Sequence, residues 1–384
     1  MSRKKKVLVA AALVLSTALS ALGIAQELRQ EGKYWVGEVQ KTFKVEKNGN
    51  LILDEVRGEV VVKAWDKNEV SIHEIKKMDI FTKAEAEAAM KNTETGYVQQ
   101  GNTIRVGGRA FDRNWIHSTF TIFVPAETEC DIKTKGGTVS VEGTKGNITA
   151  STGGGEITFQ DVGGTVKAST GGGEVRITGS RGPVTVSTGG GEVRIVKTQT
   201  KVKVSTGGGE VEILDTRGAV EVNTGGGDVH VLRAEGDVSV NTGGGSIHVD
   251  HLKGSVSANT GGGDVEMNGV QGGIDASTGG GDVTAELTLA DFSIRHKVDI
   301  KTGSGDIRLT LPEKIPATVQ ATINIKDRRG EDFQISSDFP LKITTGNTDS
   351  RVRTILATGD LNGGGDPMDL ETTNGNIRIL KAQK

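Results

Sequence analysis

The sequence contains very few cysteine, proline and aromatic residues. Among 384 residues there are one cysteine and six prolines, and aromatic side chains make up 4%. A single cysteine excludes an internal disulfide, which is compatible with a bacterial envelope protein. We expect Cys130 to be an ordinary residue at the end of a strand rather than a reactive thiol.

An excess of charge of one sign is also missing. The 46 basic and 49 acidic residues leave a formal charge of −3, so nothing favours nucleic acid or an anionic membrane as a partner. The 56 glycines follow no Gly-x-y period, which excludes collagen. The valines and isoleucines scattered along the chain argue against disorder.

One long apolar run stands at the N-terminus. The basic stretch SRKKK precedes VLVAAALVLSTALSALGIA, the order found in secretory signal peptides. We expect a signal peptide over residues 1–25, cleaved between Ala25 and Gln26, and then a mature chain without a transmembrane segment. The alternative is an uncleaved anchor, because the run is about as long as a bilayer-spanning helix. The chain is predicted to be exported, to the periplasm, the outer surface or the medium.

The sequence is rich in one repeated motif. TGGG begins at eight threonines spaced by 18 residues: Thr152, Thr170, Thr188, Thr206, Thr224, Thr242, Thr260 and Thr278. The variant TKGG at Thr134 extends the series backwards by 18 residues, and TGSG at Thr302 extends it forwards by 24. One repeat is therefore expected to carry about six extra residues.

Aliphatic side chains alternate with polar ones inside each repeat. Val175 and Ile177 recur nine residues later as Val184 and Val186, and polar residues such as Arg176 separate them. Alternation with a period of two predicts strands, so each 18-residue unit should hold two short strands with two inward aliphatic residues each. TGGG forms one corner of the unit, and its threonine is expected to face inward and bond the corner backbone.

A unit this small cannot bury its apolar face alone, but a stack of identical units can. We therefore predict an all-β fold, a parallel β-solenoid whose coils lie about 4.8 Å apart. Recurrence by nine residues favours a flattened, two-sided coil over the three-sided hexapeptide helix. The sequence does not determine the handedness of the coil.

The flanking regions are less regular. Residues 26–130 are predicted to form an N-terminal β-rich cap with one short helix at about 82–92, where Thr82 and Glu85 fit a capping box. Residues 131–310 form the regular solenoid. Residues 311–384 are expected to be irregular coils that close the other end, because terminal repeats must cover open sheet edges.

These stretches resemble a family of bacterial envelope proteins. The chain is similar to the "putative adhesin" β-strand-repeat proteins of unknown function through GEVVVKAWDKNEV, FTIFVPAETECDIKT, TGSGDIRLTLP and TTNGNIRIL, in that order within residues 45–380. The resemblance implies a secreted or surface β-solenoid and supplies no catalytic residues to transfer. "Adhesin" is here the label of a family and not a demonstrated activity.

Glycines beside an acid raise the question of a bound ion. The strand that follows GGG and the absence of a GK[ST] sequence exclude a phosphate-binding loop. A column of acids remains: Glu156, Glu174, Glu192, Glu210, Asp228, Asp264 and Asp282, with Ser246 in the eighth position. A calcium β-roll repeats its loop every nine residues, whereas this loop repeats every 18. We favour a solvated acidic stripe and keep calcium binding as the alternative.

His230 and His248 form a second candidate site. They occupy the same outward column in adjacent coils, between Glu212 and Glu266, and stacked imidazoles can hold a transition metal. Nothing in the pattern completes a set of ligands, so surface placement by chance is the interpretation we favour.

An enzyme of the pectin-lyase type is the remaining class. Such enzymes build a groove from long loops, and sugar-binding faces use exposed aromatic rings. The only aromatic residue (Phe, Tyr or Trp) between positions 131 and 286 is Phe159, which falls in an inward column. A pocket could lie only at the 24-residue step or in the flanks that carry Trp35, Trp65 and Trp115.

We therefore predict a protein without enzymatic activity or cofactor. The favoured function is an exported structural or adhesion-type β-solenoid of the bacterial envelope or surface. The alternatives are an envelope binding or stress-sensing module, with calcium as a candidate ligand, and, less favoured, a polysaccharide-active β-helix enzyme. The partner is not identified by the sequence; a cell-surface or envelope component is the candidate.

Overall fold

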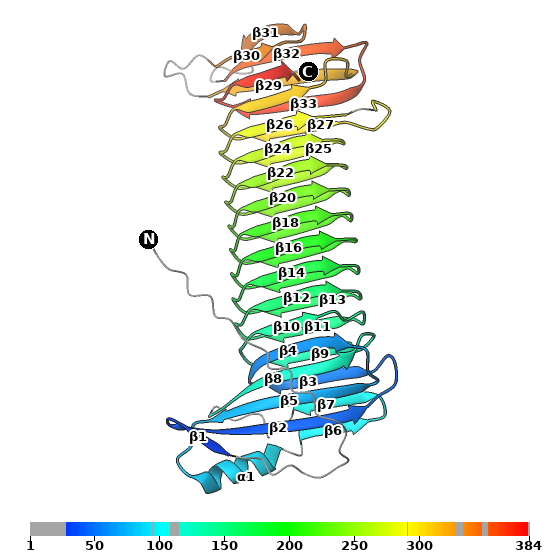
Figure 1. Cartoon of the computed structure of the whole chain (residues 1–384). Coiled ribbons are helices and arrows are strands. Elements are labelled where there is room, and N and C mark those ends of the chain that lie inside the picture. Colours follow the sequence, from blue (N-terminus) through cyan, green and yellow to red (C-terminus); the bar gives the residue numbers. More distant parts are fainter. Residues whose placement is uncertain are drawn as a thin grey trace, which may run out of the picture.

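The computed structural model shows a straight rod of stacked coils with a broader cap at each end (Figure 1). It describes residues 28–93, 96–107, 115–289, 291–326, 333–347 and 352–382. The predicted cleavage site between Ala25 and Gln26 lies outside these residues. Among the described residues, no helix is both long enough and apolar enough to cross a membrane.

The described residues form one helix and many short strands. The N-terminal elements are β1 (Arg29–Glu31), β2 (Tyr34–Lys44), β3 (Asn50–Val56), β4 (Gly58–Trp65), β5 (Glu69–Met78), α1 (Lys83–Thr93), β6 (Tyr97–Gln100), β7 (Thr103–Gly107), β8 (Ile116–Pro125) and β9 (Glu129–Thr134). The C-terminal elements are β29 (Ala317–Ile325), β30 (Ile335–Ser337), β31 (Lys342–Asn347), β32 (Arg353–Leu361), β33 (Asp366–Thr373) and β34 (Ile377–Lys381).

The strands between them alternate between two sheets. Sheet A contains β10 (Val139–Glu142), β12 (Ile157–Val162), β14 (Val175–Ser180), β16 (Val193–Thr198), β18 (Val211–Thr216), β20 (Val229–Ala234), β22 (Ile247–Leu252), β24 (Val265–Val270), β26 (Val283–Leu287) and β28 (Ile307–Leu311). Sheet B contains β11 (Ile148–Thr152), β13 (Val166–Thr170), β15 (Val184–Thr188), β17 (Val202–Thr206), β19 (Val220–Thr224), β21 (Val238–Thr242), β23 (Val256–Thr260), β25 (Ile274–Thr278) and β27 (Val298–Thr302).

Each strand pairs in parallel with its counterpart one repeat away. Val193 of β16 lies opposite Val211 of β18, and Thr188 of β15 lies opposite Thr206 of β17. The pairing across the 24-residue repeat is kept as well, since Thr278 lies opposite Thr302. The predicted parallel β-solenoid with two strands per coil is therefore confirmed.

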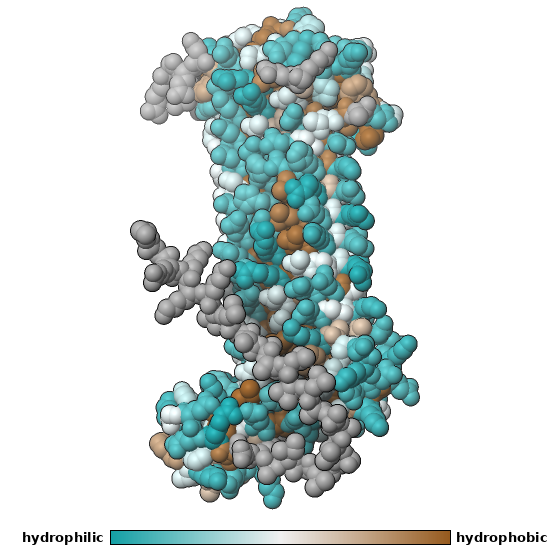
Figure 2. Space-filling view, in the orientation of Figure 1, coloured by the Kyte–Doolittle hydropathy of each residue, from teal (hydrophilic) through white to brown (hydrophobic). Residues whose placement is uncertain are grey.

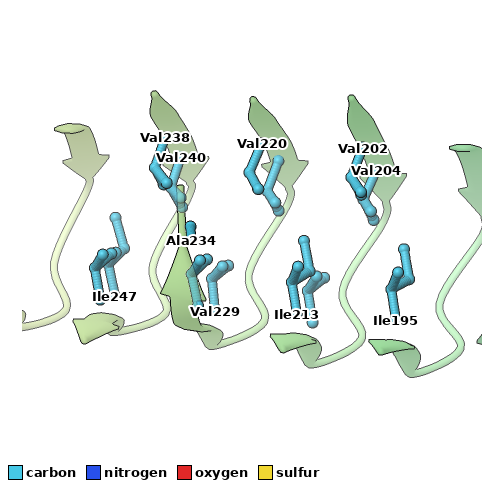
Figure 3. Packing of buried hydrophobic residues seen from close by; sticks show 14 of the residues in the cluster. Ile195, Val202, Val204, Ile213, Val220, Val229, Ala234, Val238, Val240 and Ile247 are labelled. Carbon is cyan, nitrogen blue, oxygen red and sulfur yellow. The ribbon is translucent and has the colours of Figure 1, made fainter. Parts of the chain in front are cut away.

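The core is a narrow double row of aliphatic side chains. Figure 3 shows Val202, Val220 and Val238 of sheet B facing Ile213 and Val229 of sheet A. All five side chains are at most 2% exposed. Because every coil repeats the same contacts, the buried row continues without a break from one end of the rod to the other.

Sheet A differs from the prediction, because its strands carry a third inward position. Val162, Thr198 and Thr216 are buried beyond the two expected aliphatic residues. The residue before this position has a positive φ, as at Lys197 (59°) and Asp215 (55°). This left-handed residue acts as a bulge that turns the next side chain back to the inside.

At the N-terminal end, an insertion in the sequence separates two adjacent coils. β3 and β4 pair in parallel with β9 and β10, with Leu51 opposite Cys130 and Val60 opposite Val139. The described residues between positions 66 and 128, which separate these two coils in the sequence, form the cap. In this cap β5 pairs antiparallel with both β2 and β8.

The helix α1 belongs to this cap and begins at its capping box. The Thr82 hydroxyl accepts a hydrogen bond from the Glu85 backbone N–H at 3.2 Å, and the Glu85 carboxylate accepts one from the Thr82 N–H at 3.1 Å. The helix packs through Ala86 and Met90 on a small separate core that includes Met78. The capping geometry expected from the sequence is therefore present.

A buried ion pair lies close to that small core. The Lys76 Nζ is 2.6 Å from the Glu74 carboxylate, and both side chains are fully buried. The hydroxyls of Ser118 and Tyr97 donate hydrogen bonds to the same carboxylate. Burial raises the pKa of Glu74, and the charge of Lys76 opposes that shift. A buried ion pair of this kind adds little net stability, because the cost of removing both charges from water offsets their attraction.

The C-terminal end uses the same arrangement. β33 and β34 pair in parallel with β27 and β28, with Thr302 opposite Thr372 and Ile307 opposite Ile377. Residues 312–365, which separate these pairs in the sequence, contribute β29, β30, β31 and β32 to the cap. The sequence interpretation of 311–384 as irregular coils did not include this regular coil at residues 366–381.

Candidate functional site

The threonine of each TGGG motif is buried at the corner, and in six of the eight motifs its hydroxyl also bonds the preceding coil. The Thr170 hydroxyl donates to the carbonyl oxygen of Gly155 at 2.9 Å and accepts from the N–H of Gly173 at 3.1 Å. Thr188 makes the same two bonds one coil later, with Gly173 and Gly191. The expectation that this threonine faces inward and bonds the corner is confirmed.

Two of the three glycines are required by the coil next to them. A Cβ on Gly189 would collide with the carbonyl oxygen of Gly171, and a Cβ on Gly191 would collide with that of Gly173. The middle residue, Gly190, faces open space. The triple glycine is therefore a corner at which neighbouring coils approach closely.

The aspartates of the acid column form hydrogen bonds that connect one coil to the next. The carboxylate of Asp228 accepts a hydrogen bond from the Ser246 N–H at 2.7 Å, and that of Asp264 accepts one from the Asp282 N–H at 2.8 Å. Asp282 does the same for Asp306 at 2.8 Å. One oxygen of each carboxylate is thus used by the fold.

The glutamates of the column are longer and bind basic side chains instead. Arg176 lies 2.9 Å from Glu156 and 2.6 Å from Glu174, and Glu210 lies 3.7 Å from the His230 ring. Glu192 makes no ion pair within the described part of the chain. The seven acids therefore share a line on the surface but do not share one kind of contact.

His230 and His248 do come together, with ring centroids 5.8 Å apart. Both ring nitrogens of His248 face carboxylates, with Nε2 2.7 Å from Asp250 and Nδ1 3.1 Å from Glu266. Glu212, which the sequence placed beside the histidines, pairs with Arg194. A metal ligand needs a nitrogen lone pair directed at the ion, and these carboxylates already occupy both sides of His248.

The described residues hold no group of three or more His, Cys, Asp or Glu side chains arranged to bind a metal ion. Cys130 is buried in β9, where burial raises the pKa of its thiol to about 12. The thiol is therefore neutral at ordinary pH, and a neutral thiol is a poor nucleophile.

A lateral groove crosses sheet B near its second corner. Its volume is about 600 Å³. The groove is deepest at Ser239 and Ser257, because these small residues occupy the same outward column as longer side chains such as Glu221. Arg295 and Lys297, from the 24-residue coil, line the far end. The sequence allowed a pocket at this coil, but the serines that extend it along the rod were missed.

The opposite face carries a short apolar ladder. Val196, Leu214 and Leu232 lie opposite one another on β16, β18 and β20, and they are half-buried on the outside of sheet A. Figure 2 shows apolar side chains grouped at mid-height on an otherwise largely hydrophilic rod. The sequence held a signal for this ladder that was missed, because the three aliphatic residues recur at intervals of 18 at an outward position.

The fold defines a class: a capped parallel β-solenoid built from 18-residue coils. A family model described as Toastrack DUF4097 matches residues 59–250 and again residues 197–380. The chain therefore belongs to the Toastrack DUF4097 family. The two overlapping matches follow from the internal repeat, because each stretch contains several equivalent coils.

Comparison with solved structures adds little. The crystal structure of a "putative cell adhesion protein" from Clostridium sporogenes aligns over 90% of this chain and 99% of its own, with 8% identity and a TM-score of 0.19. A likeness of that size supports no argument about fold or function. Curated proteins gave no match to this chain.

Proposed function

We propose that the protein is an exported structural or adhesion-type rod of the bacterial cell envelope or surface, without enzymatic activity. The observation that carries the proposal is the uninterrupted buried row, which makes the chain one long body whose two ends are closed by inserted segments. Repeat proteins of this kind offer extended lateral surfaces for binding. The signal-like segment at residues 1–25 supports export.

The proposal is tested first by localisation. We would express the full-length chain in a bacterial host and compare it with Val14→Arg, which places a charge in the apolar segment and leaves the rod unchanged. The full-length chain should be recovered outside the cytoplasm with Gln26 at its N-terminus, and the variant should remain inside. Retention of both proteins in the cytoplasm would refute export.

Adhesion is tested separately with the exported protein. Purified rods should bind envelope fragments of the source cells in a saturable way, and unlabelled rods should compete. Binding that is absent, or that does not saturate, would leave a structural role and rule out the adhesion-type role. Because this readout uses purified protein, its failure is distinguishable from a failure of export.

A further inference from the structure

A small pocket lies in the N-terminal cap, away from the repeated corners. Four residues line it: Tyr34, Asp79, Trp115 and His117. They come together because β2, β5 and β8 are neighbours, with Trp35 opposite Met78 and Met78 opposite Ile116. Its volume is about 250 Å³, below the usual range for a drug-sized ligand, so it suits a single ring rather than a chain.

The aromatic residues are held firmly. The N–H of Asp79 donates a hydrogen bond to the carbonyl oxygen of Trp115 at 2.9 Å, which fixes the two residues side by side. Trp115 also packs against the small core beneath α1, and both Trp115 and Tyr34 remain half-buried. The Trp115 ring therefore offers apolar surface in a fixed place, beside the half-buried Tyr34.

The two charged groups beside the pocket, Lys33 and Asp79, form an ion pair with each other. Lys33 Nζ lies 2.8 Å from the Asp79 carboxylate and 4.9 Å from the centre of the Tyr34 ring. This contact with Asp79 raises the pKa of Lys33. His117 is exposed beside them. A cationic ligand would have to displace Lys33, whereas a neutral polar ligand could use the lysine, the carboxylate and the imidazole together.

We propose that this pocket binds one sugar residue of a glycan. The apolar C–H face of a pyranose ring would lie on Trp115 or Tyr34, and its hydroxyls would donate to Asp79 and accept from Lys33 and His117. Aromatic surface beside paired donors and acceptors is the combination that a sugar requires, since each ring has an apolar face and a polar edge. The inference does not depend on where the protein resides.

The chain supplies its own control site. Lys67 lies 4.7 Å over the Trp65 ring and 3.8 Å from Glu69, a similar set of residue types. There, however, the indole stacks on Phe123 at 5.3 Å, and its N–H donates to the Glu69 carbonyl oxygen. No comparable aromatic face remains available at this second site.

The test uses full-length protein labelled with 5-fluorotryptophan and observed by fluorine NMR. Glucose, galactose and N-acetylglucosamine are added at millimolar concentrations, with choline as the cationic probe. At least one sugar should shift the Trp115 signal to saturation and leave the Trp65 signal unchanged. Asp79→Asn should weaken that binding about tenfold, and Glu69→Gln should not change it.

Three outcomes would overturn the proposal. The Trp115 signal could fail to respond to every sugar, it could respond to choline alone, or it could respond equally in the wild-type protein and in Asp79→Asn. His117→Ala serves as a second variant if Asp79→Asn lowers the melting temperature. That exposed side chain can be removed without affecting the small core, and it too should weaken sugar binding.

Discussion

Single residues of the repeat can be assigned to distinct tasks. The sequence shows three equivalent glycines in each corner, but only the first and third lie against the neighbouring coil. The pattern could predict a corner and could place the threonine inside. It could not distinguish the glycines, because the close approach is made by a chain segment 18 residues away.

Alanine substitutions should separate these glycines. Gly191→Ala would place a methyl group against the Gly173 carbonyl oxygen and should lower the free energy of unfolding by about 1–3 kcal/mol. Gly190→Ala, one residue away, meets open space and should change it by less than about 0.5 kcal/mol. Urea unfolding followed by circular dichroism measures both. Equal effects would contradict this account of the corner.

The inward threonines of the TGGG corners give a second comparison. Thr188→Val removes both hydrogen bonds of a buried hydroxyl, leaves Gly191 N–H without its acceptor and should cost about 1–2 kcal/mol. Thr185→Val, on the same strand β15, changes an exposed side chain and should be nearly neutral. Thermal unfolding of both variants would show the difference. A Thr188→Val protein as stable as wild type would exclude a structural role for these threonines.

At the scale of the elements, the side chains of the acid column make contacts with neighbouring coils and neighbouring side chains. Aspartates accept backbone N–H bonds from the next coil, and glutamates pair with basic side chains. The line of acids was readable in the sequence. Its division into two kinds of contact was not, because it depends on one methylene of side-chain length.

The column predicts different effects for two of its acids. Asp264→Ala breaks the bond to the Asp282 N–H and should destabilise the protein by about 1 kcal/mol. Glu192→Ala removes an exposed carboxylate without such a bond and should have little effect. Differential scanning calorimetry measures both, with and without millimolar calcium. If calcium raises the melting temperature of the wild type, and either substitution abolishes that rise, the column is an ion site instead.

The bulge of sheet A is a feature that the alternation of apolar and polar residues did not predict. Alternation predicted inward residues at positions such as Val193 and Ile195, and these are buried. Thr198 is buried too, because Lys197 adopts a left-handed conformation. Lysine has no special preference for that conformation, but Gly143, Gly179 and Gly269 adopt it at the equivalent position of other coils. The sequence therefore held a signal for the bulge in the glycines of this column, which alternation alone does not reveal.

At the scale of the whole molecule, the sequence could predict the stack but not its closure. The 18-residue period determines the parallel register directly, from Cys130 to Thr278. The terminal coils are assembled from segments distant in sequence: Val60 with Val139, and Thr302 with Thr372. Such pairings leave no periodic signal, and they explain why the flanks looked irregular.

The central claim is that the protein is a one-dimensional stack of interchangeable coils. Deleting residues 175–228 removes three complete coils and joins Glu174 to Val229, a junction equivalent to the natural one. Deleting residues 175–201 instead removes one and a half coils and joins a corner to the wrong sheet. The second deletion is the matched control and should fail to fold.

Small-angle X-ray scattering of the three-coil deletion is the most direct measurement. The account predicts a cooperatively folded protein with an unchanged cross-section and a maximum dimension shorter by about 14 Å, three times the strand spacing. A deletion protein that is unfolded, or one that is folded with an unchanged length, would contradict it.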